Sequence, residues 1–129
     1  MSEKVGEVKD LKPGSYVMID GEPCKVTNIT KSKPGKHGST KARVEAVGIF
    51  DDKKRSLLKP TSASCQIPII EKKGAQVISI TGELAQLMDL EDYSMFEARV
   101  PEDLKEKIQP GGECEYWRIG NRVMIKNSK

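Results

Sequence analysis

The 129-residue chain has a single histidine, His37, and only three cysteines. One histidine cannot supply a histidine-based catalytic triad or a multi-histidine metal site. Cys24, Cys65 and Cys114 lie far apart and form no Cys-x-x-Cys pair. This spacing argues against a zinc site and a disulfide framework, and it fits a reducing cytosol. We therefore expect no metal site, no catalytic residues and a cytoplasmic location.

Long apolar runs are also missing. The longest, such as Ile67–Ile70, have only four or five residues, and the first ten residues are charged. A membrane helix needs about 20 apolar residues, and a signal peptide needs an apolar segment after its charged start. We expect a soluble protein that has no membrane partner.

Aromatic residues are scarce, and single-stranded RNA is commonly bound by stacking its bases on aromatic side chains. The six aromatic residues are Tyr16, Phe50, Tyr93, Phe96, Tyr116 and Trp117. Trp117 beside Tyr116 could form a stacking platform, but a tryptophan in the core is the commoner outcome. If the chain binds RNA, we expect it to use the backbone and the shape of the RNA more than its bases.

The chain does contain short strand patterns separated by turn signals, and in the first half these predict a small β-barrel. Asp20-Gly21 is a strong hairpin signal. The expected strands are Tyr16–Ile19, Glu22–Thr30, Ala42–Phe50, Arg55–Pro60 and Ser64–Ile70.

The second half predicts a five-stranded barrel of the oligonucleotide-binding (OB) type. Its expected strands are Ala75–Thr81, Leu84–Leu90, Tyr93–Val100, Glu113–Ile119 and Arg122–Lys126. The one helix candidate is Pro101–Gln109, in which Leu104 and Ile108 are four residues apart. Pro68 and the polar segment Glu71–Gly74 predict the junction between the two barrels.

Charge is distributed unevenly along the chain. Residues 1–69 hold 13 Lys/Arg and 8 Asp/Glu, a net charge of +5, whereas residues 70–129 hold 9 and 11, a net charge of −2. A dense basic stretch lies in the first half, and no acidic residue occurs between Glu22 and Glu45. Its basic residues are Lys31, Lys33, Lys36, Lys41 and Arg43. Such a stretch could neutralise several phosphates, although an ordinary charged loop is about as common.

Pro34, Gly35 and Gly38 predict a tight loop between two strands, with Lys36 near its tip. The loop is not a phosphate-binding P-loop, because Thr30 stands where that motif needs glycine and His37 where it needs serine or threonine. In the second half, the acidic turn of Asp89, Glu91 and Asp92 could bind a cation, but such turns are more often only solvated.

The segment Lys33–Ser39, which reads Lys-Pro-Gly-Lys-His-Gly-Ser, resembles the hypusine loop of the translation initiation factor 5A family in its archaeal form. The resemblance covers nearly the whole chain, including residues 12–16, 21–24, 41–44 and 117–122. Eukaryotic members often read Thr-Gly-Lys-His-Gly-His-Ala, from which Pro34, Ser39 and Thr40 depart. Bacterial elongation factor P is a related family.

The resemblance implies that Lys36 accepts an aminobutyl group derived from spermidine through a deoxyhypusine synthase, giving deoxyhypusine or hypusine. Pro34, Gly35, His37 and Gly38 would present that lysine. The implied partners are the synthase, the ribosome and peptidyl-tRNA, with no DNA. No cofactor is expected beyond the modification itself.

Together these patterns predict an all-β protein. Residues 1–69 would form an N-terminal SH3-like barrel that carries the lysine loop, and residues 70–129 a C-terminal OB-fold barrel with one short helix. Lys31, Lys33, Lys41 and Arg43 would contact RNA. The expected function is to position peptidyl-tRNA on the ribosome, which promotes peptide-bond formation at stalled sites and termination.

The competing hypotheses are a general RNA-binding or RNA-chaperone module and an enzyme of unknown chemistry. The enzyme would need a cluster of titratable residues, and only the acidic turn offers one. The RNA-chaperone hypothesis predicts that Lys36→Arg is nearly harmless, because the charge is kept.

Overall fold

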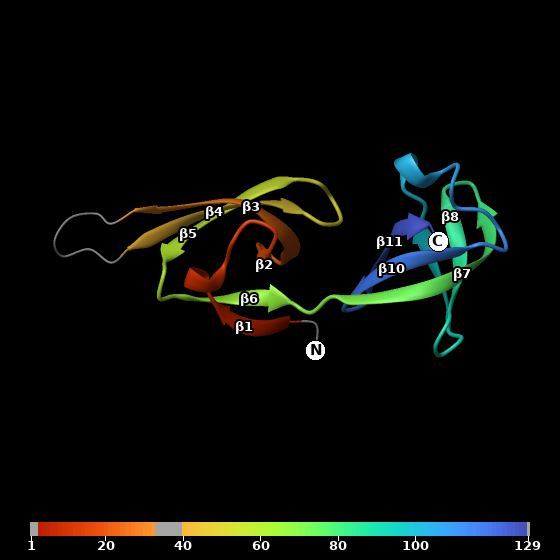
Figure 1. Cartoon of the computed structure of the whole chain (residues 1–129), viewed down its shortest axis with the longest axis horizontal. Helices are drawn as coiled ribbons and strands as arrows, with labels where there is room; N and C mark the ends of the chain where they lie inside the picture. Colours follow the sequence, from red (N-terminus) through yellow and green to blue (C-terminus); the bar gives the residue numbers. More distant parts are fainter. Residues whose placement is uncertain (1–2, 33–39, 129) are drawn as a thin grey trace. The chain divides into compact units, whose positions relative to one another are not determined.

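A computed structural model of the chain describes residues 3–32 and 40–128. The chain divides into two compact units, Met1–Ile69 and Ile70–Lys129. Strands dominate both units (Figure 1), so the all-β class predicted from the sequence is confirmed. Within the described ranges no helix is long and apolar enough to cross a membrane.

The first unit is an SH3-like barrel of antiparallel strands. Four of its strands form one sheet in the order β2-β3-β4-β5, and the other two pair as β1-β6. The elements are β1 (Glu3–Glu7), the short 3₁₀ helix η1 (Val8–Asp10), β2 (Tyr16–Ile19), β3 (Glu22–Ser32), β4 (Lys41–Gly48), β5 (Lys54–Pro60) and β6 (Ser64–Pro68). Asp20 and Gly21 both have positive φ, at 52° and 78°, as the predicted hairpin turn requires.

Strand β4 shows why this sequence forms a half-buried strand. Its side chains alternate, with Ala42, Val44 and Ala46 buried and the intervening Lys41, Arg43 and Glu45 exposed. This period of two matches the strand geometry, in which successive side chains point to opposite faces. The core of this unit comprises Val8, Leu11, Val17, Ile19, Cys24, Val26, Ala42, Val44, Ala46 and Cys65.

An ion pair closes the turn between β4 and β5. The two terminal guanidinium nitrogens of Arg55 donate to the Asp51 carboxylate, at 3.0 and 2.9 Å. The Lys53 amide donates to the same carboxylate at 3.1 Å. The Arg55 hydrogen bonds and then the Lys53 amide lower the pKa of Asp51 to about 2. The carboxylate occupies the space beside Gly48, where an added Cβ would lie 2.0 Å from Asp51 Oδ1.

The second unit is a five-stranded antiparallel sheet in the order β11-β10-β7-β8-β9. The edge strands β9 and β11 approach each other, which curls the sheet into the predicted OB-type barrel. The elements are β7 (Glu71–Thr81), β8 (Leu84–Asp89), β9 (Met95–Arg99), the 3₁₀ helix η2 (Glu102–Leu104), β10 (Glu113–Ile119) and β11 (Arg122–Ser128). Its core comprises Ala75, Val77, Ala85, Leu87, Ala98, Val100, Leu104, Ile108, Cys114, Tyr116 and Ile125.

The chain divides between Ile69 and Ile70, within the junction that Pro68 and Glu71–Gly74 predict. The segment Glu71–Gly74 is itself the start of β7, where it pairs with residues 115–118 of β10. The predicted helix Pro101–Gln109 is reduced to η2 and a following turn, in which the Ile108 amide bonds the Leu104 carbonyl at 3.0 Å. Leu104 and Ile108 are both buried, so their spacing reflects one turn packed on the core, in a segment too short for a stable helix.

Candidate functional site

The candidate site is the hairpin formed by β3 and β4 (Figure 1). The two strands pair from Cys24↔Gly48 to Ser32↔Lys41, so the segment between Ser32 and Lys41 joins adjacent strand ends. The predicted site residues Lys33, Pro34, Gly35, Lys36, His37 and Gly38 lie outside the described residues. The strand ends at Ser32 and Lys41, which form the base from which the lysine loop leaves the hairpin, are described.

Both legs of the hairpin are held at this base. On the β3 side, the ladder continues through Lys31↔Ala42 to the last pair, Ser32↔Lys41. On the β4 side, the Thr61 amide donates to the Thr40 carbonyl at 2.9 Å. This bond connects the residue before β4 to the turn between β5 and β6. The loop therefore leaves from a base that backbone hydrogen bonds fix to three strands.

The predicted RNA-contacting residues of this base do not share one face. Residues that lie directly opposite in a ladder share a face, and neighbours along a strand alternate. Lys41 and Arg43 therefore share one face of β4, whereas Lys31 is paired with Ala42 and lies on the other. The single compact patch expected from the sequence is thus divided between two faces of the hairpin.

Sequence reasoning missed one cation at this site, Lys59. It pairs with Ala42 on the side opposite to Lys31, so Lys31, Ala42 and Lys59 form a row across three strands. Ala42 is completely buried, while both lysines are exposed. Lys59 is 16 positions beyond Arg43, and only the β4–β5 register, read together with the alternation of β5, could have identified it.

The ion pairs at the base are weak. Arg43 Nε lies 3.9 Å from Glu45 Oε1, and the two side chains are 63% and 49% exposed. Exposed pairs of this kind contribute roughly 0–1 kcal/mol, so a phosphate can compete for the guanidinium. The Arg43 guanidinium is therefore accessible to an anion on the exposed face of β4.

The acidic turn of the second unit is solvated only in part, because Glu91 and Asp92 are exposed but Asp89 is fully buried. Its Oδ1 accepts the amides of Glu91 and Asp92 at 2.8 and 3.1 Å, and its Oδ2 accepts the Tyr116 hydroxyl and lies 3.6 Å from Lys73 Nζ. Burial raises the pKa of Asp89, but the hydrogen bonds and Lys73 outweigh it and lower the pKa to about 2.

This arrangement gives Asp89 a structural role. Its two oxygens already hold the turn and anchor β10, so they have little capacity left for a cation. In the described part of the chain, no group of three or more His, Cys, Asp or Glu side chains could hold a metal ion. Cys24, Cys65 and Cys114 are all buried.

Trp117, the candidate stacking residue, is only 8% exposed. The ammonium groups of Lys72 and Lys126 lie 4.8 and 4.5 Å from the centre of its ring. A base could stack on this ring only by displacing a lysine, so Trp117 offers no ready platform. Tyr93, at 68% exposure in the turn after β8, is the more accessible aromatic side chain.

Two sequence models of protein families match the chain. The model described as "Translation initiation factor 5A-like, N-terminal" matches residues 3–63, and that described as "Eukaryotic elongation factor 5A hypusine, DNA-binding OB fold" matches residues 69–129. Together the two matches span both structural units.

Individual proteins match over nearly their full lengths. The chain is 54% identical to translation initiation factor 5A of Pyrococcus furiosus, covering 95% of this chain and 92% of that protein. It is 57% identical to the protein of that name from Methanothermobacter thermautotrophicus, with 98% of each covered. Among solved structures, the eukaryotic translation initiation factor 5A from Methanococcus jannaschii superimposes with a TM-score of 0.92 at 43% identity, covering 99% of this chain and 96% of that one.

Proposed function

The chain belongs to the translation initiation factor 5A family and is a translation factor, and from this premise we propose that a modified Lys36 is its functional group. In this proposal a deoxyhypusine synthase transfers an aminobutyl group derived from spermidine to the Lys36 amine. The product, deoxyhypusine or its hydroxylated form hypusine, is a longer cationic arm that carries a second amine.

The observation that supports this proposal best is the base of the hairpin. The segment that contains Lys36 leaves and re-enters a sheet at the directly paired Ser32 and Lys41, with cationic side chains on both faces of that base. An amine that is to be alkylated by one protein and then reach toward a tRNA must extend from a fixed point. A base hydrogen-bonded across three strands supplies such a point.

The mechanism we propose is positioning. The factor binds the ribosome, and the arm reaches toward the acceptor end of peptidyl-tRNA and holds it in a reactive geometry at stalled sites and during termination. Lys31, Lys41 and Arg43, together with Lys33, neutralise phosphates around the loop. The chemistry belongs to the ribosome, so the protein itself acts in the cytoplasm as a factor and not as an enzyme.

The first test is the mass of the Lys36 peptide from protein isolated from its own cells. Recombinant protein from a host without the synthase would carry an unmodified lysine whatever the truth of the proposal. We expect a mass increase of one aminobutyl group on Lys36, with or without an added oxygen. A native peptide with unmodified Lys36 would refute the proposal and leave a general RNA-binding module as the better account.

The second test is a translation assay on a message with consecutive proline codons. Lys36→Arg keeps the charge but removes the acceptor amine, so we expect relief of stalling to be lost. Lys33→Arg is the matched control, with the same change three residues away, and we expect it to retain activity. Equal activity of the two variants would favour the RNA-chaperone hypothesis.

A further inference from the structure

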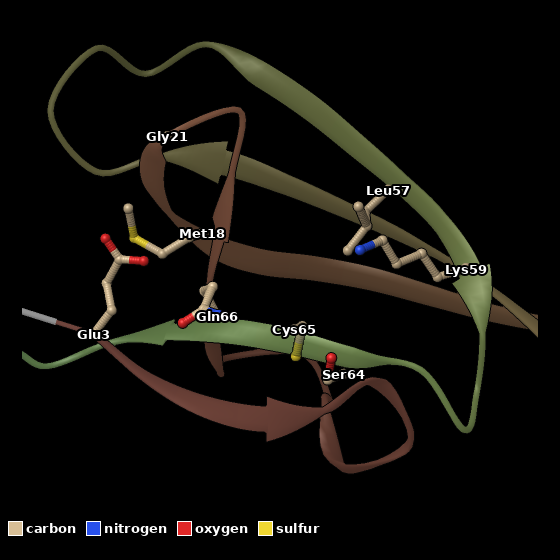
Figure 2. A pocket seen from close by; sticks show the side chains of 8 residues that line it. All are labelled: Glu3, Met18, Gly21, Leu57, Lys59, Ser64, Cys65 and Gln66. Carbon is tan, nitrogen blue, oxygen red and sulfur yellow. The ribbon is translucent and has the colours of Figure 1, made fainter.

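A cavity of about 280 Å³ lies in the first unit, between β5 on one side and β6 with β2 on the other (Figure 2). Nothing in the proposed function uses it. Small-molecule sites begin at roughly 300 Å³, so this cavity suits a group the size of a nucleobase.

One end of the cavity is cationic. Lys59, from β5, lines this end with Ser64 of β6, and its side chain extends toward Leu57 in Figure 2. Within the described part of the chain Lys59 makes no ion pair. An ammonium that makes no ion pair, at the same end of the cavity as a hydroxyl, is a suitable contact for one phosphate.

The middle of the cavity is apolar, and the end away from Lys59 carries hydrogen-bonding groups. Met18 and Leu57 contribute apolar surface, and a methionine thioether packs well against the edge or face of a ring. Figure 2 shows the Glu3 carboxylate beside Met18 at the end away from Lys59, with Gln66 between the two ends. A carboxylate and an amide are hydrogen-bonding partners for the edge of a base.

The charge pattern favours RNA over an acidic peptide. Lys59 shares its sheet face with Lys31, and Ala42 lies between them. Ala42 is completely buried, so the cation that a phosphate in the cavity would meet is Lys59. A peptide carboxylate would satisfy Lys59 but would leave the apolar middle and the Glu3 carboxylate without complementary groups.

We propose that this cavity binds one unstacked nucleotide of an RNA chain, with its phosphate at Lys59 and Ser64 and its base between Met18 and Leu57. Guanine is the preferred base, because its N1–H and N2–H donors lie side by side and can both bond the Glu3 carboxylate. The inference rests on the proposed function only in taking RNA as the partner, and it adds a contact that reads a base.

The test is a titration of the full-length chain with 5′-GMP, followed by the backbone amide shifts of each residue. We expect saturable shifts that centre on Leu57, Lys59 and Gln66. One charge-assisted contact to the phosphate predicts that GMP binds about tenfold more tightly than guanosine. Inorganic phosphate that bound as tightly as GMP would show that the base is not read.

Matched variants separate the two ends of the site. Lys59→Gln should remove the advantage of GMP over guanosine, whereas Lys54→Gln, the same charge change at the other end of β5, should leave it intact. Glu3→Gln should weaken GMP but not AMP, and so remove the preference for guanine.

Three results would overturn the proposal: no saturable binding of GMP, shifts centred elsewhere, or equal GMP binding by the Lys59→Gln variant and the unaltered chain. Binding of an acidic peptide at these residues in place of GMP would also overturn it. The Lys36 tests are independent of these outcomes. Loss of stall relief by Lys36→Arg without GMP binding would refute only the cavity proposal, and GMP binding by a chain whose Lys36 is dispensable would refute only the proposed function.

Discussion

Removing the Tyr116 hydroxyl, by Tyr116→Phe, should destabilise the second unit more than any other change of a single oxygen atom there. The ring would stay in the core, where it packs 4.6 Å from Phe96 between ring centres. The hydrogen bond to the buried Asp89 carboxylate would be lost, together with the contact between the hydroxyl and Arg118 of the same strand. The variant therefore isolates one interaction between β8 and β10.

The expected magnitude follows from what remains around the carboxylate. A hydrogen bond to a charged group contributes about 1.5–3 kcal/mol. Asp89 would keep the Glu91 and Asp92 amides and Lys73, so we take a loss of about 2 kcal/mol, near the lower end of that range. For a unit of this size that loss lowers Tm by about 10 °C, measured by circular dichroism.

The effect should also depend on pH. The folded-state pKa of Asp89 is lowered from its ordinary 3.8 to about 2, so its contribution is complete above pH 3.8 and is lost as the pH falls to 2. The pKa of Tyr116 is raised from 10.0 to about 12, by burial first and by Asp89 second, so its contribution is present below pH 10 and is lost toward pH 12. The difference in Tm between the two proteins should shrink at both extremes.

Tyr93→Phe is the matched control, because this tyrosine is 68% exposed and should tolerate the same change. A double-mutant cycle of Tyr116→Phe with Asp89→Asn should show a coupling energy of about 1 kcal/mol or more. If Tyr116→Phe melts within about 2 °C of the unaltered protein at pH 7, the buried pair does not stabilise the fold as argued.

Two further predictions concern the first unit. Gly48→Ala places a methyl group on the Asp51 carboxylate, so it should break the pair with Arg55 and destabilise this unit by about 1–3 kcal/mol, measured by chemical denaturation. Retained protection of the Lys53 amide from hydrogen exchange would contradict this. Lys41→Gln and Arg43→Gln should each reduce the slope of log affinity against log salt for RNA by about 1, and an unchanged slope would remove that residue from the RNA contacts.

Turn chemistry explains why much of the fold could be predicted from the sequence. Strand β2 occupies Tyr16–Ile19 as predicted, because Asp20-Gly21 dictates both the place and the type of the turn that follows it. The alternation in β4 was equally informative. Strand β1 was missed because all four of its side chains are exposed and its other residue is Gly6, which leaves no apolar alternation to recognise.

What the sequence could not show depended on partners that are distant along the chain. Asp89 lies in a segment whose sequence is typical of a solvated turn, but it is buried and accepts a hydrogen bond from Tyr116, 27 residues later in β10. Likewise, the register of β4 with β5, and not proximity in sequence, brings Lys59 beside Ala42. Both are effects of tertiary pairing, which local patterns do not encode.

The division of the cations between two faces changes what the hairpin can do. A single patch would contact phosphates on one side only. The hairpin could then still rotate about that contact. In the proposed function, Lys41 and Arg43 meet phosphates on the open face of β4, and Lys31 and Lys59 meet them at the two sides of the buried Ala42. Contacts from both sides restrict rotation about the hairpin axis, and a long flexible side chain gains precision only when its point of attachment is held in this way. The loss of Lys59 alone should therefore reduce the rate of the assisted step more than it reduces binding to the ribosome.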